Sequence, residues 1–283
     1  MEKVQAFIKS ASRLPAPPAL VMKIIRMTND PDTEISDIVE LFQTNSALSA
    51  RLLKLANSVF YGLRGEVTSV YRATVLLGIK TIRSLAVTVW THSISNEYQE
   101  EELQDLLSTL FLHSAAVAVI GQEIAKRVGP SYMDDVFLSG LLHDFGRLAM
   151  LCENLDTYEN SLLKLKSRDR DDLFRAEAET FGFNHAELGG ALATTWGFPE
   201  FLVQSAENHH NPSLCLESQP IPTMVFLADK LANAVLENVA NGVKPFSAEP
   251  STWALIGIED VESQTAFLSD CKEKLENLLA SIA

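Results

Sequence analysis

The sequence predicts an all-α protein in which a small N-terminal helical bundle packs on a larger C-terminal helical lobe. Apolar residues recur at intervals of three and four along almost the whole chain, which is the pattern of helices that bury one face. No convincing series of segments alternates apolar and polar residues as strands would. Gly, Pro and Asn residues separate the periodic segments and mark the expected helix ends.

The first predicted helices lie in residues 34–56. Apolar residues of the stretch 34–43 follow helical spacing, and a second apolar stripe begins just after Ser46, which we expect to cap that helix. The break at Asn45 makes the pair a short helical hairpin. A further apolar segment, 75–90, is interrupted by Gly78. Together these segments form the predicted N-terminal bundle.

The acidic run at 96–105 is the expected junction between the lobes. We therefore divide the chain into an N-terminal lobe, residues 1–100, and a C-terminal lobe, residues 101–283. The second lobe opens with a long helix, 103–128, that stops before Gly129-Pro130. A second helix is expected from residue 133 to about 152, apolar nearly all round and hence central. Later helices are expected at 171–181, 185–196, 199–208, 221–240 and 261–282.

The amino-acid composition indicates a globular protein, and the net charge limits which molecules it can bind. Of the 283 residues 47% are hydrophobic and 21% charged, which is typical of a globular protein with a sizeable core. The formal net charge of -14 excludes wrapping of DNA or RNA and disfavours an anionic membrane surface. A bound metal cation would still allow an anionic small substrate.

The sequence also bears on the compartment. The three cysteines are far apart and show no CxxC pair, which suits a reducing environment. The N-terminal segment lacks the apolar core of a signal peptide, and no run approaches the roughly 20 apolar residues of a membrane-spanning helix. We expect a cytoplasmic protein.

Several ionisable residues fall within apolar helical patterns. His143 and Asp144 stand together in the most apolar predicted segment, His113 is in register with the buried face of its helix, and Asp229 shares a face with core residues. A buried carboxylate costs several kcal/mol unless it is paired, hydrogen-bonded or bound to a cation. Three helices would thus direct a His, a His-Asp pair and an Asp inward.

Imidazole and carboxylate groups suit divalent Fe, Mn, Ni or Zn, and the lack of nearby Cys argues against a thiolate site. Adjacent helical residues point about 100° apart, so His143 and Asp144 reach one ion from its sides or bridge two. His185, which opens a helix, and the pair His209-His210 would supply further ligands. The same groups could instead form a hydrogen-bonded core without metal.

The order H … HD … H … HH … D resembles the metal motif of the HD superfamily of phosphohydrolases, with every position filled. The resemblance implies that His113, His143, Asp144 and Asp229 hold a first metal, that Asp144 can bridge, and that the remaining three histidines complete a second. The fuller pattern is similar to that of the HD-GYP phosphodiesterases. This chain departs from them in reading HDFGR, with Arg147 in a lysine's place, and in lacking the GYP segment, so cyclic di-GMP is not the expected substrate.

A second resemblance lies in the first lobe. The strings LPAPPAL at 14–20, NDPDTEISDIVELFQTNSALSARLLKLANSVFYG at 29–62 and SVYRATVLLGIKTIRSLAV at 69–87 resemble the HDOD domain, a relative of HD proteins. This resemblance implies an output or scaffold module of bacterial signalling that acts through signalling protein partners. Many HDOD proteins have lost part of the metal set, whereas this chain retains all of it.

Two functions follow as hypotheses. The preferred one is a bacterial signal-transduction module that retains a divalent metal site. The alternative is a metal-dependent phosphohydrolase or phosphodiesterase acting on a nucleotide or phosphoester. In that enzyme Asp144 would bridge the metals or orient the attacking water, and Arg147 would hold the anionic substrate. Arg147 could equally pair with Asp144, and His92 is expected to be an ordinary residue at a helix end.

Overall fold

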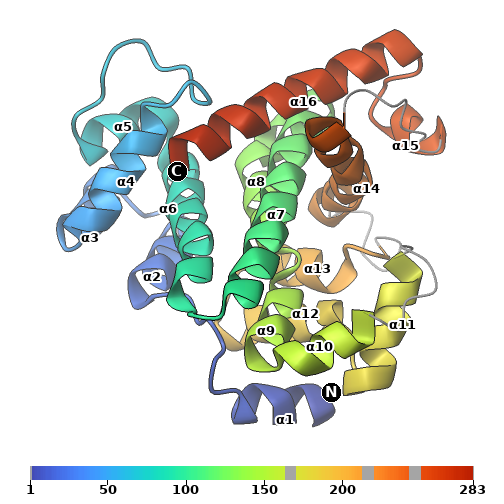
Figure 1. Ribbon diagram of the computed structural model, residues 1–283. Helices are drawn as coiled ribbons and strands as arrows, with labels where there is room; N and C mark the ends of the chain where they lie inside the picture. The colour runs from blue at the N-terminus through green and yellow to red at the C-terminus, as the bar shows by residue number, and fades with distance from the viewer. Residues whose placement is uncertain (1, 163–169, 212–219, 242–249, 283) are drawn as a thin grey trace.

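The computed structural model describes residues 2–162, 170–211, 220–241 and 250–282, and these are helical with no strand among them, which confirms the all-α prediction (Figure 1). The first part of the chain forms α1 (Glu2–Ser10), α2 (Ala19–Met27), α3 (Ile35–Gln43), α4 (Ser46–Ala56), α5 (Val70–Leu77), α6 (Ile79–Ser93) and the 3₁₀ helix η1 (Ile94–Glu97). The second part forms α7 (Glu101–Val128), η2 (Pro130–Tyr132), α8 (Met133–Leu142), α9 (Phe145–Glu153), α10 (Leu155–Leu162), α11 (Arg170–Phe181), α12 (His185–Thr195), α13 (Glu200–Asn208), α14 (Pro220–Asn241), α15 (Pro250–Leu255) and α16 (Val261–Ile282).

Helix ends in the first part follow local chemistry. The side chain of Asn45, not of Ser46 as expected, caps α4 by accepting a hydrogen bond from the backbone N–H of Leu48. Asn is as good a cap as Ser, and here it lies one residue earlier, in the extended conformation that a cap requires. Gly78 separates α5 from α6 with a φ of 87°, a left-handed value that favours glycine.

One prediction was wrong: the segment 133–152 is two helices, not one. α8 ends at Leu142 and α9 begins at Phe145, with His143 and Asp144 in the break between them. Hydrophobic periodicity does not reveal such a break, because the segment stays apolar on both sides of it. The helices α1, α2, α10 and α15 were not predicted at all.

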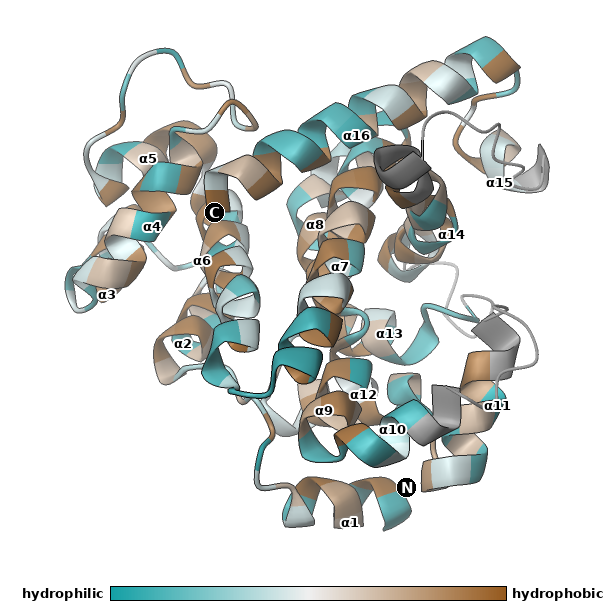
Figure 2. Ribbon diagram, in the orientation of Figure 1, coloured by the Kyte–Doolittle hydropathy of each residue, from teal (hydrophilic) through white to brown (hydrophobic). Residues whose placement is uncertain are grey.

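The long helix α7 lies at the centre of the second part, where it packs against α8, α14 and α16. By length and composition α7 would suffice to cross a membrane, but 56% of its apolar window is buried inside the protein, as in the core helix of a soluble protein. The bent pair α5 and α6 with η1 passes the same test only if it is counted as one span across a bend of 119°. Figure 2 shows that α7 starts with hydrophilic residues and becomes hydrophobic further along.

The two parts of the chain interlock. α6 packs on α8, α16 runs back to contact α4, and α1 packs against α12. Phe60, between α4 and α5, lies against Phe137 of α8 with ring centroids 6.2 Å apart, and so packs the first part onto the second. A single hydrophobic core extends through both parts. The division at residue 100 stays a prediction.

A buried ion pair also joins the two parts. The guanidinium of Arg83 on α6 is fully buried and lies 2.7 Å from Asp135 on α8, and Lys80 lies 2.7 Å from the same carboxylate. Removing one member of such a pair leaves the other buried and uncompensated. This pair therefore fixes α6 against α8, the helix that leads directly to His143.

Candidate metal centre

All seven predicted ligands converge on one buried cluster. Its members come from four helices and from the α8–α9 break: His113 from α7, His143 and Asp144 from the break, His185 from the start of α12, His209 and His210 from the end of α13, and Asp229 from α14. The structure thus brings together residues that are up to 116 positions apart in the sequence, counting from His113 to Asp229.

Asp144 is the centre of the cluster. Its Oδ2 lies 3.6 Å from Nε2 of His143 and 3.9 Å from Nε2 of His113. Its Oδ1 faces the other way, 3.4 Å from Nε2 of His185 and 3.5 Å from Nε2 of His209. The two oxygens of one carboxylate therefore face two different sets of imidazoles.

The remaining contacts complete both sets. Oδ1 of Asp229 lies 3.1 Å from Nε2 of His113 and 4.0 Å from Nε2 of His143. On the other side, the Nε2 atoms of His185 and His210 are 2.9 Å apart. Donor atoms of His113, His143 and Asp144 lie within 4.8 Å of one another, and so do donor atoms of Asp144, His185, His209 and His210. Each set could hold one ion, with Asp144 common to both.

Hydrogen bonds on the outer nitrogens orient two of the imidazoles. Nδ1 of His143 lies 2.7 Å from the Gly140 carbonyl, and Nδ1 of His209 lies 2.8 Å from the Ala206 carbonyl. A carbonyl only accepts, so each Nδ1 must carry its proton and donate it. In the neutral ring the lone pair then resides on Nε2, which faces the centre of the cluster.

These inward nitrogens are suited to a metal. Nε2 of His143 and Nε2 of His209 are buried and make no hydrogen bond within the described part of the chain. Buried polar atoms without a partner are rare and call for an explanation, such as an ion. Burial lowers the pKa of both rings, that of His143 well below its usual range, so they are neutral and able to coordinate at pH 7.

The carboxylate at the centre is ionised. Burial by itself would raise the pKa of Asp144, but the guanidinium of Arg147 beside it outweighs that effect and holds the pKa well below its usual range. Nη1 of Arg147 donates to Oδ2 of Asp144 at 2.9 Å. Arg147 therefore pairs with Asp144, one of the two roles that the sequence left open for it.

Glu177 is a member of the site that the sequence did not reveal. It is fully buried on α11 and accepts from the backbone N–H of His185 at 2.9 Å and from its Nδ1 at 2.6 Å. A carboxylate behind a metal-ligating histidine orients the ring and raises its basicity. The signal available in the sequence was an acid eight residues before a candidate ligand, in a helix of low hydropathy where acids are common.

Tyr158 closes a ring of polar contacts behind the centre. Its hydroxyl accepts from Nε of Arg147 at 3.1 Å and donates to Oε1 of Glu177 at 3.0 Å. A continuous series of hydrogen bonds thus runs through Asp144, Arg147, Tyr158, Glu177 and His185. This series holds the Asp144 carboxylate and the His185 imidazole in a fixed relative position.

The α8–α9 break and a glycine contact place these groups. Because the chain turns at His143 and Asp144, both side chains reach the same centre although they are adjacent. Gly146, on the first turn of α9, lies directly against α12: a Cβ built there would come within 1.9 Å of the His185 carbonyl oxygen. The close approach of the two backbones sets the distance between Asp144 and His185.

Substituting Glu177 with Gln is expected to weaken metal binding by about 10–100-fold, because the amide keeps the shape but not the charge behind His185. Competition with a fluorescent zinc chelator measures the change. Glu179→Gln is the matched control, since Glu179 is exposed on the same helix. Equal affinities for the two variants would remove Glu177 from the site.

The metal-free protein is expected to lose stability as the pH falls below about 6.5, the ordinary pKa of histidine. In the folded state the pKa values of His143 and His209 are lowered, so the unfolded chain binds more protons there and acid favours it. Each group contributes up to about 1.4 kcal/mol per pH unit within its window. Urea unfolding in the presence of a chelator at a series of pH values measures the slope. The double variant His143→Gln/His209→Gln should show a shallower one, and an equal slope would contradict this account.

The fold and the cluster define an all-helical protein with a buried His/Asp centre of a kind that could hold divalent metal. The family model of the HDOD domain matches residues 14–212. The chain therefore belongs to the HDOD family, as its first-lobe motifs indicated.

Individual relatives agree with this assignment. A crystal structure of an HDOD domain protein with unknown function from Geobacter sulfurreducens is 26% identical, with a TM-score of 0.77 over 99% of this chain and 96% of that one. A Shewanella amazonensis protein named "Putative phosphohydrolase" has the same fold, with 24% identity and a TM-score of 0.73 over 98% of both chains. An uncharacterized protein of Treponema pallidum is 26% identical over 226 residues, 76% of this chain but 41% of that protein, so this chain spans less than half of its length.

Proposed function

We propose that this chain is a regulatory module of bacterial signal transduction, of HDOD type, that binds divalent metal at the His/Asp centre and acts through contacts with signalling proteins. Membership of the HDOD family and the complete ligand set support the proposal. We place the protein in the cytoplasm, which agrees with free, buried thiols at Cys152 and Cys271. Cys215 lies outside the described residues.

The observation that favours regulation over catalysis is the enclosure of the centre. The side chains of His143, His185 and Asp144 are between 1% and 4% exposed, and that of His209 is fully buried. Among the described residues, a cavity between α6, α7 and α9 reaches Asp144 and has a volume of about 20 Å³. Such a space holds about one water molecule, whereas nucleotide-sized ligands need several hundred cubic ångströms. A metal held this way would stabilise or switch the fold.

The residues fit Fe, Mn, Ni or Zn, because all donors are imidazole nitrogens or carboxylate oxygens. His113, His143, Asp144 and Asp229 would hold one ion, and His185, His209 and His210, with Asp144, would hold a second. Ions bound at both ligand sets would join α7, α12, α13, α14 and the α8–α9 break, so their binding free energy would add to the stability of the fold.

Partner proteins are expected to bind at an exposed apolar surface on α5, which the sequence pattern alone did not indicate. Tyr71 and Val75 lie four residues apart on one face of α5 and are 58% and 52% exposed, and the adjacent Leu76 is 50% exposed. Large exposed apolar side chains in a cluster are typical of protein interaction sites. The net charge of -14 argues against nucleic acid and anionic membranes as partners.

A metal-dependent phosphohydrolase is the second candidate, and one observation favours it. Asp144 belongs to both ligand sets, as a carboxylate that bridges two ions would. Two ions held at such a site would supply polarisation of a phosphoryl group and a lowered pKa of bound water. Arg147 holds the Asp144 carboxylate in place, and its side chain is 26% exposed, so its free edge could meet an anionic phosphoester.

Hydrolysis assays separate the two functions. Protein loaded in turn with Mn, Fe, Ni or Zn is incubated with nucleotides, cyclic dinucleotides and aryl phosphates, beside His143→Ala prepared in the same way. The regulatory proposal predicts bound metal without turnover above that of the variant. Turnover that is lost in His143→Ala would contradict the regulatory proposal and support the phosphohydrolase function instead.

A further inference from the structure

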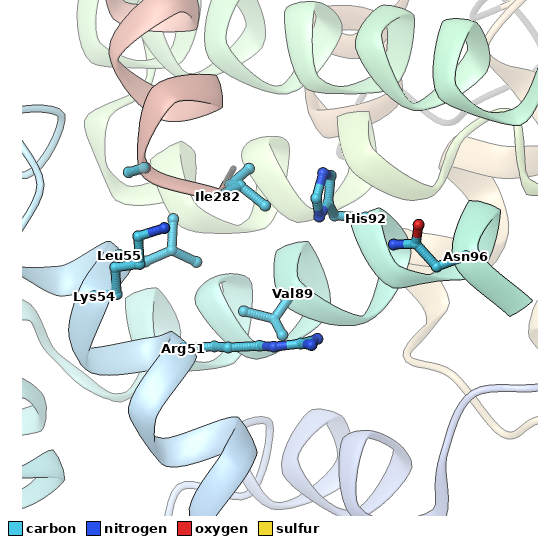
Figure 3. Close-up of a pocket in the computed structure, with 8 residues that line it drawn as sticks. Arg51, Lys54, Leu55, Val89, His92, Asn96 and Ile282 are labelled. Atoms are coloured by element: carbon cyan, nitrogen blue, oxygen red, sulfur yellow. The ribbon is translucent and has the colours of Figure 1, made fainter. Parts of the chain in front are cut away.

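A second cavity lies far from the metal centre, where the C-terminal end of α16 meets α4, α6 and η1 (Figure 3). It has a volume of about 300 Å³, which is within the range of small-molecule sites. Its lining comes from α4, from α6 with η1, and from the last turn of α16: Arg51, Lys54, Leu55, Val89, His92, Asn96, Ser281 and Ile282.

The polar part of the lining is basic. Arg51 and Lys54 lie one turn apart on α4, and neither forms an ion pair or side-chain hydrogen bond with another described residue. Two cations beside a cavity that have no carboxylate partner among the described residues form a site for an anion.

The rest of the lining suits an organic molecule. Leu55, Val89 and Ile282 supply apolar surface, while His92 and Asn96 supply hydrogen-bonding groups. His92 is held against Phe111, with ring centroids 5.1 Å apart, so its orientation is fixed. Burial and the charge of Arg51 lower the pKa of His92, which leaves a neutral ring with one donor and one acceptor. Figure 3 shows Arg51 extending beneath Val89 toward the side where His92 lies.

We propose that this cavity, the α4–α16 pocket, binds a small organic phosphate monoester, with the phosphate at Arg51 and Lys54 and its apolar group against Leu55, Val89 and Ile282. A phosphate monoester carries close to two negative charges at neutral pH and so matches the two cations. Arg51 can bind two phosphate oxygens at once, and Lys54 adds a point charge.

The position of the pocket gives the ligand a structural effect. α16 runs from the pocket onto α7 and also packs against α14, the helices that carry His113 and Asp229. A ligand bound between α4 and the end of α16 would join the N-terminal helices to the last helix. The proposal itself requires no metal and stands independently of the function proposed above.

Phenyl phosphate is the probe, titrated into the full chain in the presence of a chelator so that the metal centre cannot contribute. Binding is followed by calorimetry and by the ring resonances of the six histidines, with His92 assigned from the variant His92→Gln. The expected result is saturable binding in which the His92 resonance moves and those of His143 and His209 do not. An unmoved His92 resonance at millimolar probe, or shifts confined to the metal-centre histidines, would overturn the proposal.

Charge reversal provides the second arm. Arg51→Glu/Lys54→Glu should weaken binding of phenyl phosphate by at least about tenfold. Lys23→Glu/Arg64→Glu, which changes the net charge equally at two exposed sites elsewhere, should bind like the unmodified chain. Equal weakening by both pairs would mean general attraction of anions and would reject the pocket. Inorganic phosphate should bind more weakly than phenyl phosphate, because it leaves the apolar wall uncovered; equal affinity would reject the apolar part of the assignment.

Discussion

Asp144→Asn is expected to abolish metal binding at both ligand sets. The carboxylate has one oxygen facing His143 and the other facing His185 and His209, so a single substitution removes an anionic ligand from each. Loss of an outer carboxylate costs about 10–100-fold in affinity, and loss of a ligand shared by two ions should exceed that. Elemental analysis of protein purified without chelator measures the bound metal.

The free energy of unfolding should rise when metal binds and fall when metal is removed. At a metal concentration of 100 times its dissociation constant, a bound ion stabilises the folded chain by about 2.7 kcal/mol. Thermal unfolding of the unmodified chain should therefore respond to a chelator, whereas that of Asp144→Asn should not. Asp270→Asn is the control, since that carboxylate is 51% exposed and pairs only with a surface lysine. If Asp144→Asn retained as much metal as Asp270→Asn, the centre would not lie at Asp144.

Gly146→Ala is expected to destabilise the protein by about 1–3 kcal/mol or more, since overpacking of a tight contact costs that much. The new methyl group would lie 1.9 Å from the His185 carbonyl oxygen and 2.8 Å from the Gly189 nitrogen. Both are backbone atoms of α12 and cannot swing aside. α9 and α12 must separate, which moves Asp144 away from His185 and weakens metal binding together with stability. Urea unfolding and a metal titration measure the two effects.

Gly189→Ala is the matched control because it adds a methyl group to the same helix pair from the other side. Its nearest new contact would be the Gly146 nitrogen at 3.4 Å, close to ordinary van der Waals distance. We expect a much smaller loss of stability. Similar losses in the two variants would contradict the claim that the α9–α12 approach positions the centre.

Helix type and approximate bounds could be predicted wherever apolar periodicity and strong end signals coincide. The helix predicted at 103–128 is observed as α7, from Glu101 to the residue before Gly129, and 261–282 is observed as α16. The α8–α9 break could not be predicted, because both sides of it are apolar and neither Gly nor Pro lies between Leu142 and Phe145. The break follows from the position of His143 and Asp144 in the fold.

The convergence of the ligands could be predicted because buried charge is costly. Ionisable side chains interrupt the apolar faces of several helices at His113, at His143 with Asp144, and at Asp229. Burying each of them alone is costly, so a common partner that compensates them all is expected. Glu177 and Tyr158 escaped prediction because nothing in their local sequence is unusual. Their role depends on α11 folding back toward α9 and α12, a long-range contact that no local pattern encodes.

The pocket between α4 and α16 lay outside sequence reasoning for a similar reason. Nothing in the local sequence distinguishes Arg51 and Lys54 from other charged residues, and His92 was expected to be an ordinary residue at a helix end. They line a common cavity only because the last helix returns to the first part of the chain.

Anomalous X-ray scattering from crystals grown without chelator tests the convergent metal centre most directly. The account predicts an anomalous peak within about 2.0–2.2 Å of Nε2 of His143 and a carboxylate oxygen of Asp144, a peak within the same distance of Nε2 of His209 and the other oxygen, or both. A map with no peak there after soaking with Mn, Ni or Zn, while Nε2 of His143 and of His209 keep their places, would contradict it. The cluster would then be a hydrogen-bonded core that binds no ion.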